Sequence, residues 1–241
     1  MKRMIAILLA LTLVLALTGC SGNKEPSGTI TPQTDAPQET TAAPTEEATE
    51  ATDATVELGD MMGGVYTNAY GGFACSLDEN WQYYTAEELQ DLSDLTQEKL
   101  QDTDLSEQTG KFDQITDMMA ENYTDLTTIN INYTRLGASE RLGFALMSEE
   151  QLIDTTLQQK DLLVQTYAQA GIDVTSMEKT QVTFLGENHF AIHTAGSIEG
   201  TPYYILQLFR YNLGGPYYIT LTLASFMEDN TTGLLDLFEA A

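Results

Sequence analysis

The feature that most restricts the fold of this chain is a regular series of extended segments in its second half. Four stretches rich in β-forming residues are separated by short connections that contain turn-forming residues, mostly glycine. The four stretches are residues 177–185, 189–198, 202–212 and 216–226. Connections this short favour antiparallel pairing between consecutive strands. The second half is therefore expected to form a four-stranded antiparallel meander.

A long helix is expected immediately before this meander. Ser148 and Gln151 have the spacing of a capping box, and apolar residues recur at helical intervals from residue 148 to residue 170. Gly171 supplies the stop. Shorter strands are expected at 65–70, 72–78, 115–121 and 127–136, a loop at 101–114, a helix from Thr85 and a closing helix after residue 229. This pattern indicates an α+β domain, an antiparallel β-sheet flanked by helices.

The first nineteen residues have the layout of a secretory signal peptide. Lys2 and Arg3 precede an apolar run from residue 4 to residue 17, which is 17 − 4 + 1 = 14 residues long. A bilayer core needs roughly 20 helical residues, so this run suits a signal peptide instead. The next residues, Leu17-Thr18-Gly19-Cys20, resemble the lipobox of bacterial lipoproteins. The resemblance implies cleavage before Cys20, diacylglyceryl modification of its thiol, and a lipid anchor in the cell membrane on the extracytoplasmic side.

The segment that follows is expected to be a disordered tether. It is rich in Thr, Pro, Glu and Ala, holds four of the six prolines and has no aromatic residue. Such a composition buries too little apolar surface to offset the entropy of ordering the chain. The predicted organisation is a signal peptide at 1–19, the lipidated cysteine and tether at 20–60, and one globular domain at 61–241.

Charge excludes one class of partner. The chain carries 36 acidic and 10 basic residues, and loss of Lys2 and Arg3 with the signal leaves 8 − 36 = −28. Nucleic acid is excluded because binding it requires a basic surface that releases counterions. The bilayer is expected to be contacted through the acylated Cys20 alone, and the remaining partner is an envelope protein or a small ligand.

Alternation within the strands predicts one apolar and one polar face of the sheet. The apolar face, including Ile131 and Leu221, is expected to pack on the long helix. The polar face is a possible binding face or a solvated surface. Its main residues are Asn130, Asn132, Thr134, His189, His193, Thr220 and Thr222.

No catalytic or metal-binding motif is present in the sequence. Nucleophile elbows, phosphate loops and zinc or calcium signatures are missing. His189 and His193 on one strand would stand roughly 13 Å apart, so one metal cannot take both. Neither a metal nor a cofactor is therefore expected. Cys75, with apolar residues at alternate positions around it, is expected to be a buried structural thiol.

These observations favour a non-enzymatic binding or accessory role at the cell envelope. The alternatives are an envelope enzyme, such as a hydrolase, and a cation- or solute-binding protein. The enzyme hypothesis requires a concave pocket with a serine or a carboxylate within hydrogen-bond reach of His189 or His193.

A family resemblance points in the same direction. The segment Val65-Tyr66-Thr67-Asn68-Ala69-Tyr70-Gly71-Gly72-Phe73, followed by Leu77 and Trp81, resembles the start of PsbP-like domains of bacterial lipoproteins. With the long helix and the meander, the resemblance spans about residues 64–240. It implies an α/β/α sandwich and an accessory role. Asp78-Glu79-Asn80 replaces the proline often found before the tryptophan, and no ligand residues carry over by position.

Overall fold

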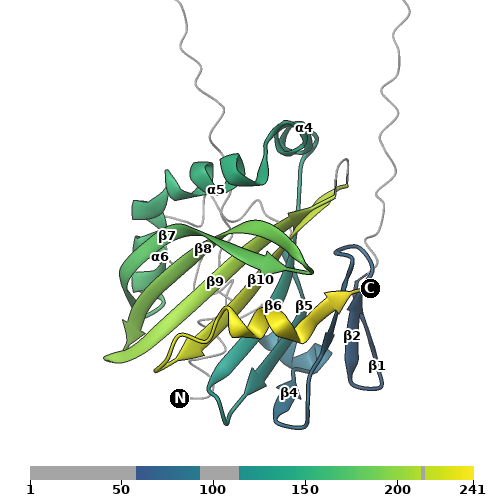
Figure 1. Ribbon diagram of the computed structural model, residues 1–241. Helices are drawn as coiled ribbons and strands as arrows, with labels where there is room; N and C mark the ends of the chain where they lie inside the picture. The colour runs from purple at the N-terminus through teal and green to yellow at the C-terminus, as the bar shows by residue number, and fades with distance from the viewer. Residues whose placement is uncertain (1–57, 93–113, 213–214) are drawn as a thin grey trace, which may run out of the picture. The chain divides into compact units, whose positions relative to one another are not determined.

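The computed structural model describes residues 58–92, 114–212 and 215–241, and its regular structure is mostly β-strand (Figure 1). The signal peptide, Cys20, the tether up to residue 57 and residues 101–113 of the predicted loop lie outside these residues, whereas Asp60 and Gln114, the last predicted residues of the tether and of the loop, begin strands. The described part is an α+β domain with two antiparallel sheets, which confirms the predicted α+β class and the antiparallel pairing. None of its helices is long and apolar enough to cross a membrane.

The large sheet contains the predicted meander. Its order is β4-β5-β6-β10-β9-β8-β7, so that β7 to β10 are consecutive neighbours. Its strands are β4 (Trp81–Tyr83), β5 (Gln114–Asn122), β6 (Thr127–Arg135), β7 (Ile172–Phe184), β8 (Glu187–Ile198), β9 (Thr201–Tyr211) and β10 (Tyr217–Phe226). The β5–β6 hairpin and the meander match the sequence prediction, whereas β4 was not predicted.

The small sheet has the order β1-β2-β3-β11. Its strands are β1 (Asp60–Met62), β2 (Val65–Asn68), β3 (Phe73–Ser76) and β11 (Phe238–Ala240). Strands β2 and β3 confirm the predicted N-terminal pair. The predicted closing helix is instead η1 (Gly233–Leu237), a short 3-10 helix that leads into β11. Pairing of β11 with β3 joins the end of the domain to its beginning, a non-local contact that local patterns do not reveal.

Three of the described helices lie between β6 and β7 in the chain. They are α4 (Ala138–Leu146), α5 (Glu149–Leu157) and α6 (Lys160–Gln169), and residues 86–92 are also helical. Capping boxes begin two of them: Ser148 and Gln151 at α5, and Thr85 with Glu88 at 86–92. The predicted long helix at 148–170 is interrupted, because α5 ends at Leu157 and α6 begins only at Lys160. Helix α4 was not predicted.

Two hydrophobic cores cover the two faces of the large sheet. One core joins the sheet to α4, α5 and α6 and includes Phe144, Leu163 and Phe209. The other joins it to the small sheet and η1 and includes Ile131 and Leu221. The prediction that the face of Ile131 and Leu221 packs on the long helix is therefore wrong. Cys75 lies in β3 within this second core, and burial raises the pKa of its thiol to about 12, as expected for a structural cysteine.

A buried polar network fastens the small sheet to the large one. Asp117 occupies a bulge in β5, and its carboxylate accepts hydrogen bonds from the Gly59 backbone N–H at 2.9 Å and from the Tyr66 hydroxyl. Asn68 donates to the Tyr66 oxygen at 2.7 Å and accepts from Tyr133 at 2.9 Å. Burial raises the pKa of Asp117 above its ordinary value, although Tyr66 and Gly59 favour its ionised form.

Candidate functional site

The predicted polar face is split between the two sides of the large sheet. Five of its residues, on β6 and β10, lie on the side that carries the helices. They are Asn130, Asn132, Thr134, Thr220 and Thr222, all 0–1 % exposed. The interpretation of these five residues as a solvated surface is therefore wrong.

The two histidines lie on the opposite side of the sheet from these residues. His189 stands opposite Val182, and His193 stands opposite Leu206. Both Val182 and Leu206 belong to the core beneath the small sheet. The prediction that all seven residues share one face is therefore wrong, because alternation within a strand does not fix its register with the next strand.

Three of the five buried residues, Asn132, Thr220 and Thr222, form an inner polar patch together with Gln207. Thr116 donates to Asn132 Oδ1 at 2.8 Å, and Tyr167 donates to Gln207 Oε1 at 3.3 Å. Four polar groups of the patch have no hydrogen-bond partner among the described residues. They are Asn132 Nδ2, Gln207 Nε2 and the hydroxyls of Thr220 and Thr222. Each buried unpaired group costs about 1–3 kcal/mol.

A pocket lies where β8 and β9 separate. The two strands are paired from Ala191 opposite Leu208 to Ile198 opposite Thr201. Beyond Ala191, residues 187–190 continue to pair with β7, whereas the end of β9 pairs with β10. The resulting fork and the α4–α5 connection enclose a pocket of about 340 Å³, hereafter the fork pocket.

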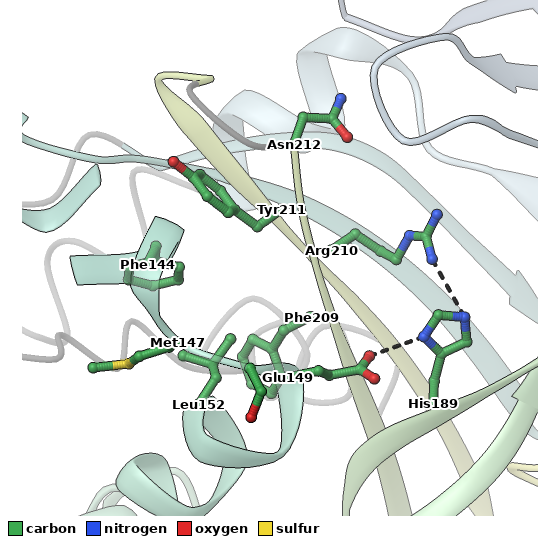
Figure 2. A pocket seen from close by; sticks show the side chains of 10 residues that line it. Phe144, Met147, Glu149, Leu152, His189, Phe209, Arg210, Tyr211 and Asn212 are labelled. Atoms are coloured by element: carbon green, nitrogen blue, oxygen red, sulfur yellow. Dashed lines mark hydrogen bonds and ion pairs between the residues drawn. The ribbon is translucent and has the colours of Figure 1, made fainter. Parts of the chain in front are cut away.

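The fork pocket has an apolar wall and a polar wall. The apolar wall comes from α4, α5 and β9 and includes Phe144, Leu152 and Phe209 (Figure 2). Glu149, His189 and Arg210 provide charged and titratable groups on the other wall. These three side chains come from the first turn of α5, from β8 and from β9, and the fork allows them to meet.

The Glu149 carboxylate takes the place of a neighbouring strand beside β8. Its Oε2 accepts a hydrogen bond from the Phe190 backbone N–H at 3.1 Å, and its Oε1 lies 2.9 Å from His189 Nδ1. A proton on Nδ1 is assigned from this contact, since the carboxylate can only accept. In the neutral ring, Nε2 is then an acceptor, and it lies 3.4 Å from Arg210 Nη1.

Arg210 has a half-buried guanidinium that forms no ion pair among the described residues. Its contacts are a 3.4 Å approach of Nη1 to His189 Nε2, a 3.5 Å approach of Nη2 to the Gly71 carbonyl oxygen, and a cation–π contact in which Cζ lies 5.8 Å from the centre of the Phe184 ring. Both polar distances exceed those of ordinary N–H···O bonds, about 2.7–3.2 Å. The guanidinium therefore has donors available to a further partner.

His193 belongs to a separate surface cluster. Its Nε2 lies 2.7 Å from Asp229 Oδ2, and its ring stacks on Tyr204 at 6.5 Å. Burial raises the pKa of Asp229, but hydrogen bonds from Thr231 and the nearby His193 outweigh this effect, so the pKa lies below its ordinary value. No group of three potential metal ligands occurs within the described parts of the chain.

Sequence reasoning missed Glu149 and Arg210. Glu149 follows the Ser148 cap, where an acidic residue is common for helix stability alone. Arg210 gave a signal that could have been used, because it is a charged residue directly after the segment from Tyr203 to Phe209, which is apolar or aromatic except at Gln207.

The described part of the molecule is an antiparallel α+β domain. The fork pocket, which has one apolar and one polar wall, lies where β8 and β9 of the large sheet separate. Neither a model of a known protein family nor a curated protein matches the chain.

Proposed function

We propose that this protein is a lipid-anchored extracytoplasmic lipoprotein with a non-enzymatic binding role at the cell envelope, and that the fork pocket is its ligand site. The observation that carries the proposal is a pocket of about 340 Å³ that combines an apolar wall with Arg210, whose guanidinium makes only long polar contacts among the described residues. Concave, largely apolar sites with a few convergent polar groups are the usual form of small-ligand sites.

The anchored part of the proposal rests on the N-terminal sequence. The charged start, the 14-residue apolar run (17 − 4 + 1) and the lipobox-like Leu17-Thr18-Gly19-Cys20 support export and acylation of Cys20. The Thr- and Pro-rich segment at 20–60 then serves as a spacer between the membrane and the domain at 61–241. We assign the domain to the PsbP-like type on the segment from Val65 to Trp81, which supports an accessory role.

The binding role is tested by native mass spectrometry of the full-length protein taken from its own membranes. A retained mass beyond the lipidated chain is expected. Met147→Trp places a large ring on the pocket wall and should remove the retained mass. Leu142→Trp is the matched control, because Leu142 is 65 % exposed on α4 and does not line the pocket. Equal retained mass in both variants would contradict the assignment of the pocket.

One observation favours an envelope hydrolase as the second candidate. The Glu149–His189 pair in the pocket has the carboxylate–imidazole contact that orients a general base. Within the described residues, however, no serine, threonine or cysteine side chain is hydrogen-bonded to His189. Hydrolysis of p-nitrophenyl acetate at equal rates by the native protein and by His189→Gln is expected. A rate that depends on His189 would favour the enzyme.

A further inference from the structure

The described part of the chain provides no counter-ion for the charge of Arg210, although acidic residues are plentiful in the sequence. The sequence has 36 acidic and 10 basic residues, yet Arg210 forms no ion pair among the described residues. By contrast, Lys179 lies 2.8 Å from both Glu150 and Asp154. A half-buried charge without a partner costs free energy, which a ligand of opposite charge recovers.

The shape and number of the available donors restrict that ligand. A guanidinium is planar, and its parallel N–H groups match the two oxygens of a carboxylate. Among the described residues that line the pocket, Arg210 is the only lysine or arginine, so it balances one negative charge. The net charge of −26 repels anions, and it does so more strongly when they carry more than one charge. A singly charged carboxylate fits both conditions.

The opposite wall determines the rest of the ligand. Phe144, Leu152 and Phe209 offer apolar surface to the same pocket. Glu149 is held by the His189 ring and the Phe190 amide, so hydrogen bonds within the protein already stabilise its charge. A second charged group on the ligand is therefore not needed, and an apolar body gains from leaving water.

We infer that the fork pocket binds a small monocarboxylic acid with an apolar body, with the carboxylate on the Arg210 guanidinium and the body against Phe144, Leu152 and Phe209. This inference rests on the proposed function, because it names the ligand class of the same site. A carboxylate at Arg210 would also lie beside His189 Nε2. It would therefore compete only with the long contact of 3.4 Å between Arg210 Nη1 and His189 Nε2, and not with a strong hydrogen bond.

The test uses three probes of one shape but different charge. They are 3-phenylpropionate, 3-phenylpropanamide and 3-phenylpropylamine, titrated by calorimetry into the purified full-length protein. The acid is expected to bind about tenfold or more tighter than the amide, because only the acid pairs with the guanidinium. The amine is expected to be the weakest of the three.

Variants assign the preference to the arginine. Arg210→Met should remove the preference for the acid while the amide still binds, which shows that the pocket remains folded. Arg210→Lys keeps the charge but not the planar fork and should keep part of the preference. Arg141→Met is the matched control, since it removes one arginine charge outside the pocket lining and should leave the preference unchanged.

Each outcome separates the two proposals. Equal binding of acid and amide would overturn the carboxylate inference and leave the fork pocket as a ligand site. Tighter binding of the amine would overturn it in favour of a cation held by Glu149. Absence of acid binding would also overturn it. The proposed function itself would be contradicted only if the native experiment found no retained mass that Met147→Trp removes.

Discussion

At the scale of single residues, a substitution of Thr222 tests whether the hydroxyl groups of the inner polar patch lack hydrogen-bond partners. Its side chain is fully buried, and its hydroxyl has no partner among the described residues. Thr222→Val keeps the shape and removes the hydroxyl, so we expect the free energy of unfolding in urea to rise by about 1 kcal/mol.

Thr231→Val is the matched control for this prediction. Thr231 is equally buried, but its hydroxyl donates to Asp229 Oδ1 at 2.7 Å. Its replacement should lower the free energy of unfolding by about 1 kcal/mol, because the acceptor loses its donor. A similar loss in Thr222→Val would show that the patch hydroxyl is hydrogen-bonded in solution.

Asp117 predicts a pH dependence of stability whose sign is opposite to that of most carboxylates. Its pKa is raised in the folded state above the ordinary value of 3.8, so the folded state holds the proton more firmly than the unfolded state. This contribution to stability is present below the unfolded pKa and is lost as the pH rises through the folded pKa. The difference in unfolding free energy, wild type minus Asp117→Asn, should therefore fall as the pH rises above about 4.

Unfolding in urea at several pH values measures this difference. Other titrating groups contribute equally to both proteins and cancel. Asp229→Asn is a useful comparison, because the pKa of Asp229 is lowered and its contribution is lost only as the pH falls below about 3.8. A difference for Asp117→Asn that stays constant with pH would show that burial does not perturb this carboxyl.

At the scale of elements, the open edge of β8 depends on Glu149. The Phe190 N–H donates to the Glu149 carboxylate instead of to β9. We expect amide hydrogen exchange at Phe190 to accelerate in Glu149→Ala, because its acceptor is removed. Glu149→Gln keeps a carbonyl acceptor and should exchange at nearly the native rate. Glu150→Ala is the control on the same helix turn, and faster exchange in that variant would point to general loosening of α5.

The elements themselves were largely predictable, whereas their faces were not. Strand positions follow from glycine turns and alternation. Strands β8, β9 and β10 lie within two residues of their predicted bounds, whereas β7 begins at Ile172, five residues before its predicted start. The face of His189 was predicted wrongly because the end of β7 and the start of β8 were missed. Leu185 and Gly186 form a two-residue turn with φ of 53° and 81°, which sets Phe184 opposite Glu187 and Val182 opposite His189. Reading that turn correctly would have moved the histidine to the other face.

The fork pocket could not be deduced from local patterns, because it depends on where two strands stop pairing. Glu149 and Arg210 are 61 residues apart, 210 − 149, and meet only because β9 leaves β8 before its end. The helix break has a similar origin. Residues 148–170 have helical periodicity throughout, but α5 lies against both β7 and β8 whereas α6 lies against β7. Tertiary packing therefore outweighed local propensity.

At the scale of the whole molecule, the net charge and the proposed lipid anchor have separate roles. Without Lys2 and Arg3 the chain carries 8 − 36 = −28, so an anionic bilayer repels it and opposes the adhesion of the domain. Under the proposed function, stable attachment to the membrane must come from acyl chains. Two chains are needed, since one chain binds only reversibly.

Cys20→Ala therefore tests the proposal at this scale. After metabolic labelling with a palmitate analogue, the wild-type protein should carry label and partition into the detergent phase of Triton X-114, because its acyl chains enter micelles. Cys20→Ala should carry none. Cys75→Ala removes the other cysteine and should remain labelled, since Cys75 is fully buried in β3. Label on Cys20→Ala, or its absence from the wild type, would remove the basis for a lipid anchor, and residues 20–60 would then need a role other than that of a membrane tether.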